Sequence, residues 1–175
     1  KSGKATGYYK TTDPKEIIDL WNLRKKGVGL LGKTEGERKP IPFVEDTAVP
    51  VKNLARYISD FKKLLDSYDL EYAMYGHVDV GCLHVRPAID LKNPDEEVWV
   101  RELSDQVVSL VKKYGGVMWS EHGRGFRSEY TVDFFGEELQ QDLRHIKEAF
   151  DPNNRLNPGK IVTPYSHKEP VVPIE

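Results

Sequence analysis

Hydrophobic residues recur every three or four positions in several stretches of the chain, the spacing of amphipathic helices. Signals for helix ends agree, because Asp13-Pro14 and Asn93-Pro94 are typical helix starts and glycines or Asp151-Pro152 close the stretches. We therefore expect four helices, over residues 13–26, about 51–67, 93 to about 114, and 136–150.

The segment from residue 71 to residue 90 is rich in β-forming residues and is interrupted at Val80-Gly81, which predicts two strands joined by a tight turn. VMWSE, residues 117–121, predicts a further short strand, and the polar stretch from Gly32 to Pro42 predicts a loop. These elements indicate an α+β fold, an antiparallel sheet covered by helices on one face. We expect one domain over residues 1–164 and a flexible tail over 165–175.

Composition restricts the possible partners. With 26 Lys+Arg against 28 Asp+Glu, the chain has no basic field for nucleic acid, and no run of 18 apolar residues could span a membrane. The single cysteine, Cys82, excludes an internal disulfide and agrees with a reducing compartment, so we expect a cytoplasmic protein. Lys1 stands where an initiator Met is expected, which indicates a piece of a longer chain.

Two of the five histidines, His77 and His84, lie in the predicted hairpin. If Val80 and Gly81 form its turn, the two histidines are directly opposite, with Cβ atoms about 4.5 to 5.5 Å apart, close enough to hold one metal ion. The alternative is a pair of half-buried histidines with ordinary hydrogen-bond partners. The same register divides the other hairpin residues between a polar face (Tyr75, Asp79, Cys82, Arg86) and a core face (Met74, Val78, Leu83, Val85).

A glutamate and a histidine, Glu121 and His122, lie in a glycine-rich turn. Neighbouring side chains in extended backbone point to opposite sides, so one of them could bind an ion while the other reacts. The alternative is a Glu at a helix start and a His in a solvated loop.

Three segments together resemble a known family. GHVDVGCLHVRPAID, SEHGRGFRSEY and AFDPNNRLNPGKI resemble the C-terminal, ferredoxin-like cap domain of FAD-linked oxidases of the D-lactate dehydrogenase, glycolate oxidase and D-2-hydroxyglutarate dehydrogenase type. HVRP, FVEDTAVP and EHGRGFRSEY resemble the branch fused to an iron-sulfur oxidoreductase module. The resemblance covers about residues 20–164.

The resemblance implies a divalent metal site with His77, His84 and Glu121 as ligands and His122 as the catalytic base. Two imidazoles and a carboxylate suit zinc first and would also accept manganese or iron. One position departs from the family, since Cys82 stands where the hairpin motif HxGDGNxH has Asn, and the role of that position is open.

A substrate carboxylate needs a cationic clamp, for which Arg86, Arg24 and Arg124 are candidates, each with an alternative as an ordinary surface arginine. The resemblance further implies that Asn157, Gly159 and Lys160 approach a flavin. FAD itself would be bound mainly by a domain outside these residues, and an iron-sulfur cluster would belong to the fused module.

The expected function is the substrate and metal half of a dehydrogenase that oxidises a D-2-hydroxy acid, of the D-lactate or D-2-hydroxyglutarate class, by hydride transfer to FAD. The alternative is a metal-stabilised structural or interaction domain without redox chemistry. The sequence leaves open the particular hydroxy acid, the metal, the electron acceptor and the oligomeric state.

Overall fold

A computed structural model describes residues 7–30 and 35–174, with only the backbone for residues 28–30. The chain forms two compact units, Lys1–Gly36 and Glu37–Glu175. The domain expected over residues 1–164 stays a prediction. Each unit is described by itself.

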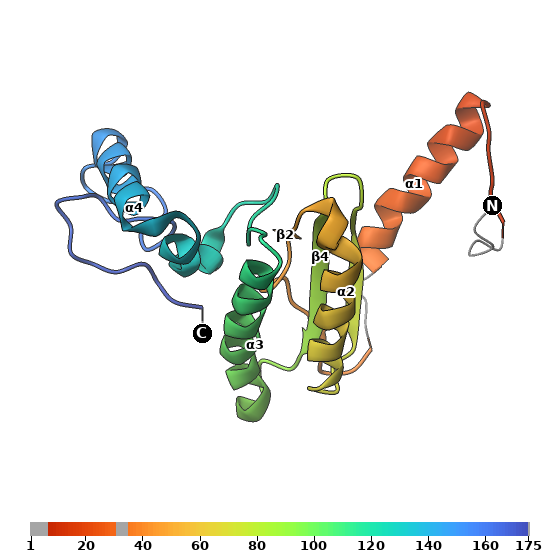
Figure 1. Cartoon of the computed structure of the whole chain (residues 1–175), viewed down its shortest axis with the longest axis horizontal. Helices are drawn as coiled ribbons and strands as arrows, with labels where there is room; N and C mark the ends of the chain where they lie inside the picture. The colour runs from red at the N-terminus through yellow and green to blue at the C-terminus, as the bar shows by residue number, and fades with distance from the viewer. Residues whose placement is uncertain (1–6, 31–34, 175) are drawn as a thin grey trace. The chain divides into compact units, whose positions relative to one another are not determined.

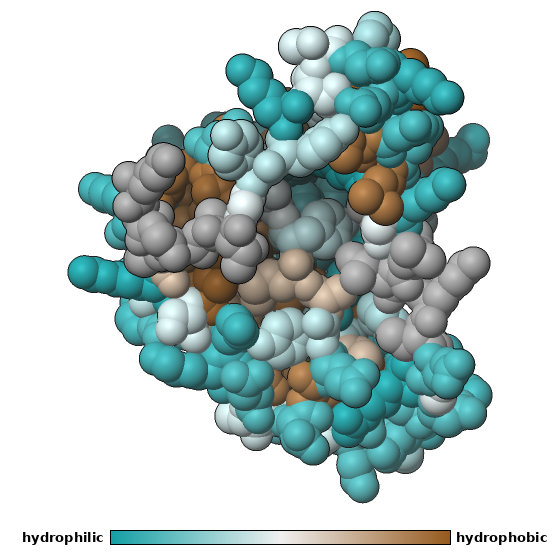
Figure 2. All heavy atoms as spheres, turned by 90° about the vertical axis from the view of Figure 1, so that its right-hand side faces the viewer, coloured by the Kyte–Doolittle hydropathy of each residue, from teal (hydrophilic) through white to brown (hydrophobic). Residues whose placement is uncertain are grey.

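The first unit contains helix α1 (Pro14–Leu30), which confirms the helix predicted from residue 13 and extends it past Gly27. Asp13 starts the helix, since its side chain accepts a hydrogen bond from the backbone N–H of Lys15 at 2.7 Å. The apolar side chains of α1 are exposed rather than packed in a core; they are Ile17, Ile18, Leu20, Trp21 and Leu23. Hydrophobic surface between hydrophilic side chains is also visible on the face of the molecule in Figure 2.

The second unit is an antiparallel sheet packed against two helices (Figure 1). Strand β4 (Cys82–Ile89) pairs with β1 (Lys39–Pro40), β2 (Thr47–Ala48) and β3 (Tyr72–His77). Helices α2 (Val51–Asp66) and α3 (Pro94–Lys113) agree with the predicted ranges. The expected α+β class with an antiparallel sheet is therefore confirmed.

The two faces of β4 have different partners. Leu83 and Val85 belong to the core cluster together with Tyr57 and Phe61 of α2 and Val107 of α3. Cys82, His84 and Arg86 alternate with them and lie on the opposite face, as strand geometry requires. The helices thus cover one face of the sheet, and the candidate site residues of β4 lie on the other face.

The hairpin turn is longer than predicted. His77 pairs with Cys82 and Tyr75 pairs with His84, so the turn contains residues 78–81 and the direct pairing of His77 with His84 was wrong. Because the register differs by two residues rather than one, the side chains on the two strands keep the faces that the sequence predicted. Val78 and Asp79 lie in the turn instead, and the core position predicted for Val78 was wrong, since it is 68% exposed.

Three other predicted elements differ from the structure. The loop predicted from Gly32 to Pro42 contains strand β1, and its residues 32–34 lie outside the described ranges. VMWSE forms no strand; only Val117 makes an isolated bridge, to Ala48, because the following turn is held by side chains instead. The last helix, α4 (Thr131–Phe150), begins five residues early and is kinked at Gly136, whose φ of 78° only glycine adopts readily. A 3-10 helix, η1 (Gly125–Tyr130), precedes it.

The C-terminal residues contact the rest of the second unit. Arg144 donates to the carbonyl oxygen of Tyr165 at 2.9 Å, and the backbone N–H of Ile174 donates to Glu129 at 3.1 Å. Ile174 is buried. The tail predicted from residue 165 thus has a defined path in the structure, and its flexibility stays a prediction. None of the helices in the described ranges is long and apolar enough to cross a membrane.

Gly81 offers a test of how tightly the hairpin turn is fixed. Its φ is +75°, and a Cβ there would collide with the carbonyl oxygen of Val49. Gly81→Ala should therefore lower the free energy of unfolding by about 3 kcal/mol, from backbone strain plus the clash. Gly115 is the matched control, with φ of +68° and open space around it, and Gly115→Ala should cost about 1 kcal/mol. Urea unfolding of the chain measures both, and equal losses would contradict the tight packing of this turn.

Candidate metal and acid-base site

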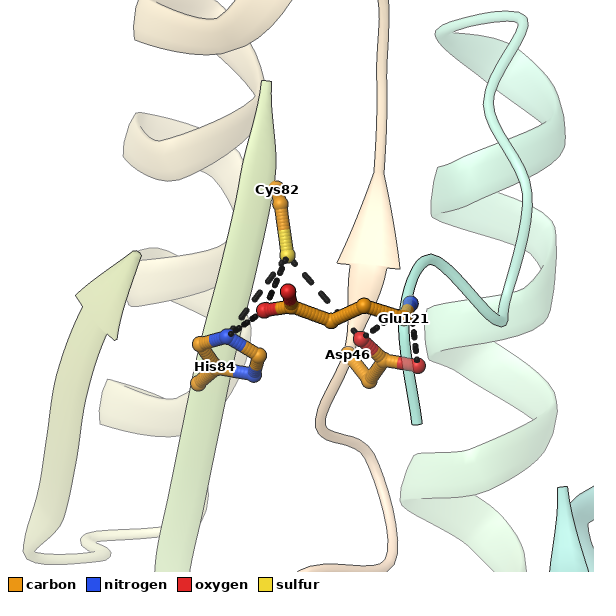
Figure 3. A group of neighbouring side chains, drawn as sticks. All are labelled: Asp46, Cys82, His84 and Glu121. Atoms are coloured by element: carbon orange, nitrogen blue, oxygen red, sulfur yellow. Dashed lines mark hydrogen bonds and ion pairs between the residues drawn. The ribbon is translucent and has the colours of Figure 1, made fainter. Parts of the chain in front are cut away.

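Three segments that are distant in sequence meet beside β4. Cys82 and His84 come from β4, Asp46 from the residue before β2, and Glu121 from the turn after Val117 (Figure 3). Of these four side chains, only Glu121 is exposed. One donor atom from each lies within 4.8 Å of the others, so together they could hold a metal ion.

The carboxylate of Glu121 is the meeting point of the two hairpin histidines. Its Oε1 lies 3.0 Å from Nε2 of His77 and 2.9 Å from Nε2 of His84. The three residues predicted as ligands are therefore neighbours, although His77 is not in the group whose donor atoms all lie within 4.8 Å. His84 is 2% exposed, and its other ring nitrogen, Nδ1, has no hydrogen-bond partner among the residues that the structure describes.

Asp46 holds the turn that carries Glu121 and His122. Its buried carboxylate accepts backbone N–H groups from Ser120 at 2.9 Å, Glu121 at 3.0 Å and His122 at 2.9 Å. The φ of Asp46 is 65°, in a left-handed region that Asp tolerates better than most residues. Charge-assisted bonds of this kind are about twice as strong as neutral ones. The position of Glu121 relative to β4 therefore depends on Asp46.

Glu45 contacts both His122, the predicted base, and Arg86, a predicted substrate-binding arginine. Its Oε1 lies 3.3 Å from Nδ1 of His122, and its Oε2 accepts a hydrogen bond from Nε of Arg86 at 3.0 Å. The ring of His122 stacks on that of His84, with centroids 4.7 Å apart. Nδ1 of His122 thus faces Glu45, while its ring lies against that of His84.

A buried arginine, Arg127, connects the segment of Glu45 with the turn that follows Val117. Its guanidinium donates to the carbonyl oxygens of Glu45, Met118 (3.3 Å) and Gly123 (3.1 Å). Burial lowers its pKa below the ordinary value, while the charges of Asp46 and Glu45 oppose that effect. Arg127 thus supports both acidic residues without entering the cluster of donor atoms.

The site has an unbalanced negative charge. Of its three carboxylates, Glu45 pairs with Arg86 and Asp46 is bound by backbone N–H groups, whereas the ion-pair partners of Glu121 are two histidines. Burial raises the pKa of the Cys82 thiol. A divalent cation would offset the negative charge of Glu121 and bind the two imidazole nitrogens, so the donor set fits a metal of the zinc type.

The other predicted binding residues are in different settings. Arg86 lies on the site face of β4, whereas Arg124 packs between the rings of Trp119 (4.7 Å) and Phe135 (5.1 Å). Arg24 is an exposed residue of α1 and lies 5.4 Å from the ring of Trp21, in the separate first unit.

The residues predicted to approach a flavin lie near the C-terminal tail. Asn157 is exposed and Lys160 lies 3.8 Å over the ring of Phe126. Gly159 is buried and faces Val172, whose backbone N–H donates to the Gly159 carbonyl oxygen at 2.9 Å. Asn157 and Lys160 are thus the more accessible of the three.

Glu45, Asp46 and Arg127 were not assigned a role from the sequence. The signal that could have identified the first two is a pair of acidic residues inside the apolar run FVEDTAVP. Charges in a buried segment need partners, and such charges are often part of a site. Nothing in the sequence indicated that the partners would be the N–H groups of residues 120–122.

Comparison with known proteins identifies the family. Residues 1–161 match the model of the family "FAD linked oxidases, C-terminal domain", and the chain belongs to that family. The predicted family resemblance is confirmed.

Curated relatives include D-2-hydroxyglutarate dehydrogenases and a D-lactate dehydrogenase. The chain is 53% identical over its whole length to 17% of the D-2-hydroxyglutarate dehydrogenase of Pantoea ananatis (strain AJ13355). It is 55% identical over 89% of its length to 15% of the enzyme of that name from Escherichia coli (strain K12). It is also 35% identical, over 73% of its length, to 28% of the D-lactate dehydrogenase of Archaeoglobus fulgidus (strain ATCC 49558 / DSM 4304 / JCM 9628 / NBRC 100126 / VC-16). The chain therefore spans only a minor part of these relatives.

A solved structure shares the fold. The 4-ethylphenol oxidase from Gulosibacter chungangensis, solved as its isoeugenol complex, superposes with a TM-score of 0.56 at 18% identity, covering 88% of this chain and 32% of the other. At that identity the likeness concerns the fold alone.

Asp46→Asn tests the anchoring of the turn. Asn keeps the shape and the left-handed backbone but loses the charge and turns an N–H₂ group toward N–H donors, so the free energy of unfolding should fall by about 1 to 3 kcal/mol. Hydrogen exchange at the backbone N–H of Glu121 and His122 should speed up. Asp133→Asn, which removes an exposed ion pair with Lys112, is the control and should cost about 0.5 kcal/mol or less. Unchanged exchange in Asp46→Asn would show that the turn is held by other contacts.

Proposed function

We propose that this chain is the substrate and metal half of a flavin-dependent dehydrogenase that oxidises a D-2-hydroxy acid to the 2-oxo acid, with D-2-hydroxyglutarate as the first substrate to test. The observation that carries the proposal is the convergence of His77 and His84 on Glu121, with His122 stacked on His84. Relatives at 53% and 55% identity that are named D-2-hydroxyglutarate dehydrogenase support the substrate class.

His122 has the geometry of a general base. A neutral imidazole accepts a proton at one nitrogen only if the other carries the hydrogen, and the Glu45 carboxylate, 3.3 Å from Nδ1, stabilises that hydrogen there. Nε2 is then the proton acceptor. In the proposed reaction, it removes the hydroxyl proton of the substrate.

Arg86 would bind the substrate carboxylate next to this base. Its Nε is used by Glu45, and the guanidinium is partly exposed, at 25% of the side-chain surface. The remaining N–H groups form a planar fork of the kind that binds a carboxylate with two hydrogen bonds. Glu45 thus fixes the distance between the clamp and the base.

The metal ligands in this proposal are His77, His84 and Glu121. A bound divalent metal, zinc in the first instance, supplies a Lewis acid that lowers the pKa of a substrate hydroxyl. The chain's own residues supply the ligands and, through Asp46, hold Glu121 at β4.

Bound FAD supplies a two-electron acceptor for the α-hydrogen, which leaves as hydride. Asn157 and Lys160 are the proposed contacts of this chain with the flavin, and Gly159 forms the turn between them. The rest of the FAD site, and an iron-sulfur module, would belong to a longer protein of which the relatives are examples.

Metal binding separates the proposal from a non-metal role. The chain should bind about one zinc ion, and His84→Ala should lose at least about tenfold in affinity, because it removes a buried ligand. His145→Ala is the control, since His145 stacks on Tyr165 and should not alter affinity. Calorimetric titration gives both values, and equal binding by wild type and His84→Ala would refute the ligand assignment.

Metal removal separates a catalytic site from a purely structural one. The helix-covered face of the sheet contains the core, so the chain should stay folded after treatment with a chelator, with a modest loss of thermal stability. Complete unfolding on chelation, followed by circular dichroism, would favour the structural domain instead.

His122→Ala tests the base in the full-length protein. Turnover of D-2-hydroxyglutarate should fall by about 10²- to 10⁴-fold, the usual contribution of a positioned general base, with the metal content unchanged. Steady-state kinetics and metal analysis measure the two effects. Because Glu45, His84 and His122 also form a possible donor group, loss of the metal with near-normal turnover would make His122 a ligand.

A further inference from the structure

Cys82 is a member of the cluster of four donor residues beside β4. Its sulfur lies 3.6 Å from Nε2 of His84 and 3.9 Å from Oε1 of Glu121 (Figure 3). The residue is 1% exposed, and it stands directly opposite His77 in the hairpin register. The sulfur therefore faces the same point as the proposed metal ligands.

These distances agree with ligands that share one ion. Metal–sulfur and metal–nitrogen bonds of about 2.3 and 2.0 Å in a tetrahedral site place the two ligand atoms about 3.5 Å apart. The sulfur lies 3.6 Å from Nε2 of His84, close to that separation, at a distance that also suits a weak hydrogen bond to sulfur. The sulfur to Glu121 distance of 3.9 Å needs a movement of only a few tenths of an ångström.

Asp46 is the competing fourth donor, and its hydrogen bonds argue against it. Both of its carboxylate oxygens accept backbone N–H groups of residues 120–122. Ligation by Asp46 would weaken the bonds that position Glu121. The sulfur of Cys82, by contrast, makes weak contacts of 3.6 to 3.9 Å with Asp46, His84 and Glu121 and holds no part of the turn's backbone.

We propose that Cys82, as a thiolate, is a ligand of the metal ion bound by His84 and Glu121, and that it makes the site selective for soft divalent metals such as zinc over manganese. The proposal rests on the proposed metal site. On binding, the metal–sulfur bond forms and the thiol proton leaves to solvent. Thiolate favours zinc, cobalt and cadmium, whereas manganese prefers oxygen ligands. If His77 also binds, a substrate oxygen makes the ion five-coordinate, which zinc accepts during catalysis.

Cobalt binding to the 175-residue chain tests this directly, because Cys82 is its only cysteine. A thiolate ligand gives Co²⁺ an intense near-ultraviolet charge-transfer band, which should saturate at one ion per chain. Cys82→Asn restores the residue of the family motif and should bind Co²⁺ without that band. The same variant should lose about tenfold or more in zinc affinity and leave manganese affinity nearly unchanged.

The outcomes separate this proposal from the metal site itself. Visible cobalt absorption without the charge-transfer band in the wild type would overturn ligation by Cys82 and leave the site of His77, His84 and Glu121 standing. Failure of the wild type to bind Co²⁺ or zinc at all would overturn both. Equal loss of zinc and manganese affinity in Cys82→Asn would overturn the selectivity. Cys82→Ser, which is close to Cys in volume, checks that a change of side-chain volume does not cause the loss of zinc affinity.

Discussion

The contact between the Asp46 carboxylate and the backbone N–H groups of Ser120, Glu121 and His122 is the constraint on which the site depends. The turn itself forms no strand in the described part of the chain, and the isolated bridge from Val117 to Ala48 precedes it. A buried carboxylate with three charge-assisted hydrogen bonds replaces a strand ladder there. It places Glu121 against the histidines of the hairpin and directs His122 toward Glu45. A single buried charge thereby fixes both the proposed ligand and the proposed base.

The core residues and the candidate site residues of β4 lie on opposite faces of the sheet. Leu83 and Val85 face the helices, while Cys82 and His84 alternate with them and face the site. The alternation means that ligands can lie on a rigid strand without replacing any residue of the apolar core. This arrangement is favourable for a binding site, because side chains on a central strand have little freedom to move.

The two units differ in how they bury apolar surface. The second unit has its own core, whereas α1 of the first exposes Ile18, Trp21 and Leu23 among others. The D-2-hydroxyglutarate dehydrogenase of Pantoea ananatis is about six times as long as this chain, which covers 17% of it.

The sequence by itself determined the helices, the α+β class, the two faces of the hairpin and the family. These depend on local periodicity and on motifs, which neighbouring residues define. It also selected His77, His84 and Glu121 as one group, which the structure brings together. Only the tertiary structure decided the hairpin register, the absence of a strand at VMWSE, and the roles of Glu45, Asp46 and Arg127. The register depends on how residues 78–81 close the turn, and the three charged residues act through partners far away in sequence, so no local pattern could reveal them.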